Sequence, residues 1–195
     1  MGTAMTCRLR GLALIGLIGC AVGSVSIWPV SAQVIAGREA DIKAGFLYNF
    51  ARFIVWPQDA FNGPSDPLRI ELIGRDPFDG RLDQIFAGKI VNNRPIRVIY
   101  SLSGNEPPSG HMVVVSASEA KRLTSLLEEC GRKPIVTVSD IDGFVASGGM
   151  IGFVTDNKRI RFAISNTIAE QRGLHVDSRM LSLALLVDGK TVLIQ

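Results

Sequence analysis

The amino-acid sequence predicts an α/β fold, a single-domain layered sandwich with a mixed, mostly parallel sheet. Apolar, strand-like segments alternate with helical segments along the chain, which is the pattern of a sheet covered by helices. A late pair of strands flanks the tight-turn segment Thr155–Lys158, and this hairpin makes the sheet mixed. The length of 195 residues, with no change of composition after residue 33, fits one domain.

The first predicted element of this domain is a helix over Ala40–Phe53. Its apolar side chains recur on one helical face and predict a buried stripe. These residues are Ile42, Phe46, Phe50 and Phe53. Pro57 ends the helix, because the residue before a proline is forced out of the helical region. The polar segment Gln58–Pro67 then predicts turns.

Later elements follow from the same periodicities. Alternating or continuous apolar runs predict strands at Leu68–Ile73, Arg94–Tyr100, His111–Val115, Pro134–Ser139, Met150–Val154 and Arg159–Ile164. Helical periodicity predicts helices at Arg81–Phe86, from a cap at Ser116 or Ser118 to Gly131, at Asn166–Arg172 and at Asp177–Val187. Ala120, Leu123, Leu126 and Leu127 form the expected buried side of the second of these helices. Thr191–Ile194 is either a final strand or a tail.

The N-terminal segment has the pattern of an export signal. It lacks acidic residues, carries Arg8 and Arg10, and continues into the apolar run Gly11–Val22. Small residues in Val30-Ser31-Ala32 predict a signal peptide over 1–32 and a domain over 33–195. Leu17–Cys20 offers an alternative, because it resembles a lipobox and would leave a lipid-anchored chain beginning at Cys20.

Charge and cysteine content exclude several function classes. The chain has 21 basic and 18 acidic residues, and loss of the two signal arginines leaves it nearly neutral. Nucleic-acid binding is therefore not expected, because it would need a clustered basic stripe. A chain that begins at Gln33 keeps Cys130 alone, so an intramolecular disulfide is not expected.

No pattern for catalysis or metal binding emerges. His111 and His175 lack companions at metal-ligand spacing, so structural roles are expected for both. The segment Gly74–Gly80 lacks a phosphate-binding glycine pattern, and its aspartates would repel anions. We therefore predict that the protein is not an enzyme and that it holds no cofactor and no metal.

The unusual features are apolar. The helix over 40–53 and its C-terminal continuation carry more aromatic area than one stripe requires, and Tyr48 and Trp56 fall off the main face. Met180–Val187 is apolar nearly all round. Either these side chains complete the core, or they form a partner-binding surface.

Four ordered blocks resemble the YfiR family, also called the DUF4154 domain. The blocks are Lys43–Pro57, Gly74–Gly80, Gly148–Val154 with Arg159–Asn166, and Gly173–Ala184. The resemblance implies a compact periplasmic α/β sandwich that tends to form homodimers and inhibits the periplasmic part of an inner-membrane diguanylate cyclase. Such inhibition lowers cyclic di-GMP signalling and biofilm formation, and release can involve envelope redox state or an OmpA-like outer-membrane lipoprotein. The family often has a cysteine before the histidine of the strand at His111, whereas this chain has Gly110.

The candidate binding residues come from the aromatic helix, the 74–80 segment, the hairpin and the last helix. They are Phe46, Tyr48, Asn49, Phe50, Phe53, Trp56, Asp76, Phe78, Arg161, Met180, Leu181 and Leu185. A second hypothesis is a periplasmic small-molecule-binding protein, in which Phe46, Tyr48, Phe78 and Arg161 line one site.

Overall fold

The computed structural model describes residues 30–102, 106–188 and 190–191. Its strands are β1 Ile54–Val55, β2 Leu68–Ile73, β3 Ile90–Val91, β4 Arg94–Ser101, β5 Met112–Val115, β6 Val136–Ser139, β7 Ile151–Asp156, β8 Arg159–Ile164, β9 His175–Val176, β10 Leu186–Val187 and β11 Lys190–Thr191. Its α-helices are α1 Val30–Phe53, α2 Leu82–Phe86, α3 Leu123–Cys130, α4 Asn166–Gln171 and α5 Ser178–Leu183. Two 3-10 helices, η1 Gln58–Ala60 and η2 Ala117–Arg122, complete the elements.

Within these residues, nine strands form one sheet in the order β11-β10-β8-β7-β6-β5-β2-β4-β3. The central strands β4, β2, β5, β6 and β7 run parallel to one another, and β3 pairs antiparallel to β4. The β7–β8 hairpin is antiparallel, and β10 then pairs parallel to β8. The predicted fold class, with a mixed and mostly parallel sheet, is confirmed.

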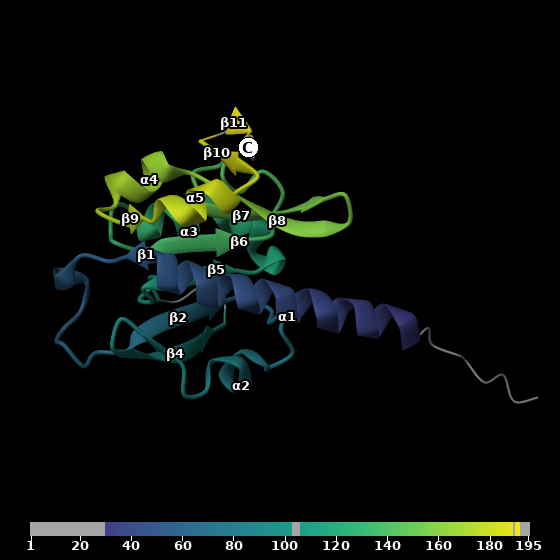
Figure 1. Cartoon of the computed structure of the whole chain (residues 1–195), viewed down its shortest axis with the longest axis horizontal. Helices are drawn as coiled ribbons and strands as arrows, with labels where there is room; N and C mark the ends of the chain where they lie inside the picture. The colour runs from purple at the N-terminus through teal and green to yellow at the C-terminus, as the bar shows by residue number, and fades with distance from the viewer. Residues whose placement is uncertain (1–29, 103–105, 189, 192–195) are drawn as a thin grey trace, which may run out of the picture.

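Helices cover both faces of the sheet, with α1 running across one of them (Figure 1). Alternate strand residues point to opposite faces. Ile70 of β2 and Val114 of β5 therefore share a core with α1, whereas Val113 of β5 packs with Leu126 of α3. Buried residues of α2, α4 and α5 belong to the α1 side. The result is a layered sandwich with α3 alone among the α-helices on the second face of the described chain.

Helix α1 begins at Val30, ten residues before the predicted start. Its N-terminal turns extend past the sheet in Figure 1. The residues from 30 to 39 contain no proline and are mostly helix-tolerant, so nothing in them stops the helix. The predicted signal-peptide boundary after Ala32 lies in this helix, while residues 1–29 lie outside the described part of the chain.

The buried face of α1 differs from the predicted aromatic stripe. Small residues contact the sheet closely, together with two larger ones: Ala40, Ala44, Leu47, Phe50 and Ala51 are all buried. Ile42 is 44% exposed, so its assignment to the stripe was wrong. Alanines permit a close approach of helix and sheet, and the larger side chains then pack around that contact.

Two helices were predicted with the wrong extent. The segment after Ser116 starts as η2, whose tighter winding buries Glu119 and leaves Ala120 exposed. Helix α5 ends at Leu183 rather than at Val187, because the following residues add β10 to the open edge of β8. The amide of Leu185 donates to the carbonyl of Phe162 at 2.8 Å, and Asp188 donates to Ile164 at 2.9 Å. Formation of a sheet ladder has overridden the helical pattern.

The remaining elements agree closely with the sequence. Strand β2 has the predicted bounds, and the β7–β8 turn places Asn157 and Lys158 at φ of 47° and 62°, as a two-residue hairpin turn requires. Gly173 follows α4 with φ of 68°, the left-handed conformation that glycine commonly adopts just after a helix. Thr191 belongs to β11, and residues 192–195 lie outside the described chain. None of the described helices has the length and apolar character needed to span a membrane.

Candidate functional site

The aromatic residues of α1 divide into a core cluster and an outer pair. Phe46 and Phe50 pack against Phe153 of β7 and Phe162 of β8, with ring centroids 5.1–6.0 Å apart. Such pairs stabilise a fold beyond their buried area. Phe50 is 1% exposed and Phe46 is half-buried, so this cluster fixes α1 on the sheet rather than forming a free surface.

Three further candidates also belong to the core. Trp56 is 7% exposed, and its indole nitrogen donates to the carbonyl oxygen of His111 at 3.1 Å. Phe78 and Met180 are buried as well. In this conformation these side chains are not available as direct partner contacts. Leu181 of α5 and Leu185, which lies between α5 and β10, are half-buried.

The 74–80 segment is a turn stabilised by its own residues. The Asp76 carboxylate accepts hydrogen bonds from the amides of Phe78 at 2.8 Å and Gly80 at 2.6 Å. Gly74 has φ of 95°, and a side chain there would collide with Ser118 and Glu119. The segment therefore closes against η2, and Asp76 serves the turn.

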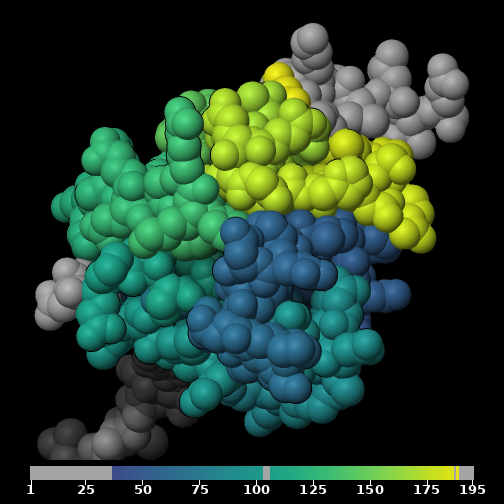
Figure 2. All heavy atoms as spheres, turned by 90° about the vertical axis from the view of Figure 1, so that its left-hand side faces the viewer, coloured from purple at the N-terminus to yellow at the C-terminus, as the bar shows by residue number. Residues whose placement is uncertain are grey.

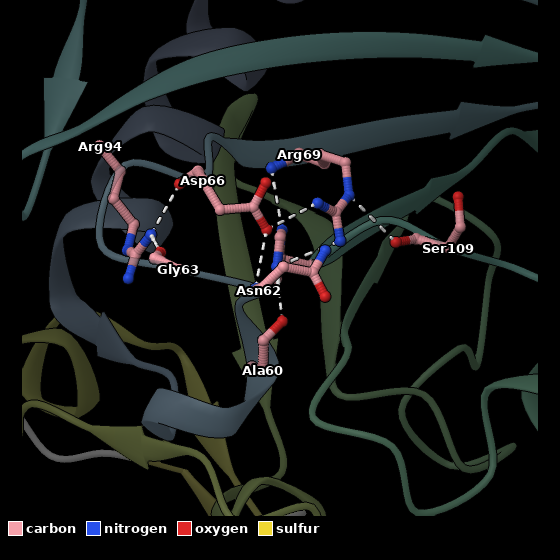
Figure 3. Close-up of polar contacts among 8 residues, drawn as sticks. Ala60, Asn62, Gly63, Asp66, Arg69, Arg94 and Ser109 are labelled. Carbon is pink, nitrogen blue, oxygen red and sulfur yellow. Dashed lines mark hydrogen bonds and ion pairs between the residues drawn. The ribbon is translucent and has the colours of Figure 1, made fainter.

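A polar cluster around His111 holds the η1 segment against the sheet. Figure 3 shows Ala60, Asp66 and Arg69 of this cluster. The Nδ1 atom of His111 accepts from the amide of Arg69 at 3.0 Å, so Nε2 carries the proton and donates to the carbonyl of Ala60 at 3.0 Å. Burial, together with the nearby charges of Arg69 and Arg94, lowers the pKa of His111. Both ring nitrogens are engaged, which supports the structural role predicted for this histidine.

The charged side chains around this cluster also have hydrogen-bond partners. Asp66 accepts from the guanidinium of Arg69 at 3.1 Å and from the amide of Asn62 at 3.2 Å. The hydrogen bond from Asn62 and that from Arg69 lower the pKa of Asp66. Arg94 donates to the carbonyls of Gly63 and Asp66, both at 2.7 Å. Figure 2, which views the molecule from this end, shows the 56–67 segment below the α4 region.

At the carboxyl end of β6, an edge of the sheet where α/β folds often bind ligands, Asp140 forms an ion pair with Lys43 of α1. Lys43 contacts Asp140 at 2.8 Å and Glu39 at 2.7 Å. Burial alone would lower the pKa of Lys43, but its hydrogen bonds to the two carboxylates outweigh burial and raise it. Across the described ranges, no three His, Cys, Asp or Glu residues are grouped so that they could hold a metal ion.

The outer face of α1 is the strongest candidate interaction surface. We define it as Tyr48, Asn49, Arg52 and Phe53 of α1 with the flanking Lys89 and Arg179. The helical residues lie at spacings that place them on one side. Asn49 and Arg52 are exposed, while Tyr48 and Phe53 are half-buried. Of the predicted contacts, Tyr48, Asn49 and Phe53 therefore reach the surface together.

Cations lie over both rings of this outer face. Lys89 Nζ lies 4.5 Å from the centroid of the Tyr48 ring. The Arg52 guanidinium lies 5.7 Å from Tyr48 and 5.9 Å from Phe53, and that of Arg179 lies 5.2 Å from Phe53. Such contacts orient the cations on the surface. Tyrosine and arginine are also enriched at the energetic centres of protein interfaces.

Arg179 is additionally held by the residue that caps α5. Its Nη2 and Nε atoms contact the two oxygens of Asp177 at 2.7 and 3.0 Å. These hydrogen bonds lower the pKa of Asp177 to about 2. Asp177 also accepts from the backbone amide of Arg179, which fixes the start of α5 beside the end of α1. The flanking cation therefore has a defined position.

An apolar groove of about 520 Å³ lies on the other face of the sheet. The 141–146 turn lines one side, and residues of β7, β8 and β10 line the other, among them Gly152, Val154, Ala163 and Leu186. A side chain at Gly152 would come within 3.2 Å of Val145, so glycine leaves the groove open. Sequence reasoning missed this site. The small residues Gly152 and Ala163 on neighbouring strands were the available signal.

The four residues of the small-molecule hypothesis do not come together. Phe46 belongs to the aromatic cluster, Tyr48 to the outer face of α1, and Phe78 lies beneath the 74–80 turn. Arg161 lies on β8 and pairs with Val154 of β7. None of these four residues is among those that line the groove.

Comparison with known proteins gives a family and a fold. Residues 40–185 match the family described as YfiR/HmsC-like. The crystal structure of a conserved domain protein from Vibrio cholerae O1 biovar El Tor strain N16961 is similar, with 10% identity and a TM-score of 0.51. The match covers 62% of this chain and 55% of that chain, and at this identity it shows the fold alone. No curated protein matches the chain.

Proposed function

The chain belongs to the YfiR/HmsC-like family, and from this premise we propose that it is a periplasmic regulatory protein that inhibits an inner-membrane diguanylate cyclase. Inhibition lowers cyclic di-GMP signalling and biofilm formation. The family match covers nearly all of the domain predicted over 33–195 and contains all four sequence blocks, which supports the proposal. The signal at the N-terminus, or a lipid anchor at Cys20, would deliver the protein to the periplasm.

The observation that carries the proposal is the outer face of α1. Its two aromatic rings are half-buried and oriented by cations, as residues of a preformed protein-binding surface are. The described residues contain no group of three or more His, Cys, Asp or Glu that could hold a metal ion. We therefore assign the periplasmic part of the cyclase to this surface. A homodimer and an OmpA-like lipoprotein that relieves inhibition belong to the same proposal.

Binding and signalling together test this function. The purified chain is expected to retain the periplasmic part of a diguanylate cyclase from the same organism in a pull-down. Deletion of its gene is expected to raise cyclic di-GMP in the cell. Tyr48→Ala is expected to weaken binding at least about tenfold, since truncation of a central tyrosine commonly costs 2 kcal/mol or more, while the melting temperature stays near that of the wild type.

Tyr100→Ala is the matched control. Tyr100 is a second tyrosine that reaches the surface, 43% exposed, but it lies on β4, next to the edge strand β3. Its truncation is expected to leave cyclase binding unchanged. Absence of cyclase binding by the wild type, together with unchanged cyclic di-GMP after deletion, would reject the function. Trp56→Ala is unsuitable as a surface variant, because removal of this buried ring is expected to unfold part of the core.

The apolar groove supports a second candidate, a periplasmic small-molecule-binding protein. Its volume of about 520 Å³ falls in the range of ligand pockets, and its lining is mainly apolar. A library of envelope metabolites should then contain a compound that raises the melting temperature. Ala163→Phe fills the groove and is expected to abolish that rise. A flat response of the wild type across the library rejects this candidate.

A further inference from the structure

The outer face of α1 carries excess positive charge. Arg52, Lys89 and Arg179 surround its two rings, and Asp177, which is bound to Arg179, supplies the nearby carboxylate. Among the described residues, neither Arg52 nor Lys89 has a carboxylate within 4.0 Å. These two cations are therefore held over aromatic rings without a neutralising partner in the described chain.

The N-terminal half of α1 has the opposite arrangement. Its acidic side chains are already paired, Glu39 with Lys43 at 2.7 Å and Asp41 with Arg81 at 3.0 Å. Arg38, also in this half, is exposed and has no carboxylate within 4.0 Å among the described residues, whereas Arg52 near the C-terminal end shares its aromatic rings with Lys89 and Arg179. An approaching chain with negative charge therefore meets several cations on one surface at the C-terminal end of α1.

We propose that the outer face of α1 binds an acidic segment of a protein partner, with carboxylates of that segment paired to Arg52 and Lys89. This inference rests on the proposed function for the identity of the partner, the periplasmic part of the cyclase. The planar guanidinium of Arg52 presents N–H groups at its edge, which match the two oxygens of a carboxylate. Lys89 supplies a second, compact charge next to the ring of Tyr48. Because both cations already rest on rings, pairing restricts them less than it would restrict free side chains.

A membrane surface fits these observations less well. Electrostatic binding to anionic lipids generally uses clusters of about four to eight basic residues. The outer face of α1 has three, and one of them already pairs with Asp177. Its two rings are half-buried, so they offer little apolar area to a lipid layer. The charges therefore suit a few defined carboxylates better than a lipid layer.

A charge-reversal experiment tests the inference. The double variant Arg52→Glu with Lys89→Glu is expected to bind the periplasmic part of the cyclase at least about tenfold more weakly, with a smaller dependence on salt. The control is Lys121→Glu with Arg132→Glu. It changes the net charge equally at exposed positions in η2 and just after α3. This control is expected to bind like the wild type, and circular dichroism is expected to show both variants folded.

The outcomes separate the inference from the proposed function. If the wild type binds and the Arg52/Lys89 double variant binds equally well, the acidic-segment inference is overturned while the proposed function stands. If the wild type does not bind the cyclase, both are overturned. Rescue of the double variant by lysine substitutions at acidic positions of the cyclase supports direct pairing. Binding of the wild type to phosphatidylglycerol vesicles, lost in the double variant while cyclase binding persists, assigns the face to lipid instead.

Discussion

Gly110 and Glu71 form a contact that the sequence pattern does not reveal. The buried carboxylate of Glu71 accepts from the amides of Ser109 at 2.8 Å and Gly110 at 2.7 Å, and from the hydroxyl of Ser101 at 2.7 Å. These hydrogen bonds join β2, the end of β4 and the approach to β5. A side chain at Gly110 would lie 2.7 Å from the Glu71 Cβ atom. Glycine is therefore required by close approach at this position.

Gly110→Ala should destabilise the protein by about 1–3 kcal/mol, because the added methyl group forces the Glu71 contact apart. Urea unfolding measures the loss. Gly45→Ala is the control, since Gly45 lies in α1 with no atom within 4 Å of the added carbon. It is expected to stabilise the helix by about 0.5–1 kcal/mol. Equal stability of Gly110→Ala and wild type would contradict the close approach.

His111 predicts a specific acid sensitivity. Burial lowers its pKa below the ordinary value of 6.5, so the unfolded chain binds a proton more readily than the folded one. Stability contributed by the neutral ring is thus present above about pH 6.5 and is lost as pH falls through the folded pKa. Urea midpoints at pH 7.5 and pH 5 should differ more for wild type than for His111→Gln. An equal pH response in the two proteins would remove His111 as the cause.

At the scale of elements, α1 shows why a hydrophobic stripe is not always the contact face. Ala44 is fully buried against the sheet, whereas Ile42 is largely exposed. Ala44→Leu should cost about 1–3 kcal/mol by overpacking this contact. Ile42→Ala should change stability by less than about 0.5 kcal/mol. Thermal unfolding compares the stability of the two variants. A larger loss of stability for Ile42→Ala than for Ala44→Leu would support the apolar stripe predicted from the sequence.

Periodicity predicted the elements that determine their own conformation. Strand β2 and the β7–β8 hairpin contain alternation and turn residues that act locally, and both were predicted well. Strands β1, β3, β9 and β10 have two residues each, and they form because they pair with neighbouring strands. Leu186 and Val187 have helical spacing in the sequence, yet the edge of β8 pairs with them. No local pattern contains that information.

The candidate surface was predictable only in part for the same reason. Tyr48 and Trp56 were both predicted to fall off the main apolar face, yet Tyr48 is half-buried and Trp56 is buried. Trp56 is buried because the chain turns at Pro57 and brings the indole to the carbonyl of His111. Lys89 and Arg179, far apart in sequence, reach the outer face of α1 only through the tertiary fold. The groove likewise depends on strands brought together by the sheet.

At the scale of the whole molecule, Gly110 stands where the resemblance to the family leads us to expect a cysteine, and hydrogen bonds rather than a disulfide fix this position. Gly110 donates to the carboxylate of Glu71 there, and Cys130 is a free, buried thiol on α3. Burial raises the pKa of Cys130 to about 11, so the thiolate that reacts in disulfide exchange is scarce at neutral pH. The described fold therefore contains no redox-dependent crosslink between its layers.

The protein should accordingly respond little to reductant. Dithiothreitol at neutral pH is expected to leave both the melting temperature and cyclase binding unchanged. Iodoacetamide is expected to label Cys130, which is 1% exposed, only at the rate at which the protein opens. Cys130→Ala serves as the control for labelling and should bind the cyclase normally. A fall in melting temperature on reduction would show that a disulfide, within one chain or between two, contributes to the native state. Redox chemistry would then contribute to the stability of this protein, in addition to the carboxylate and backbone hydrogen bonds that join its strands.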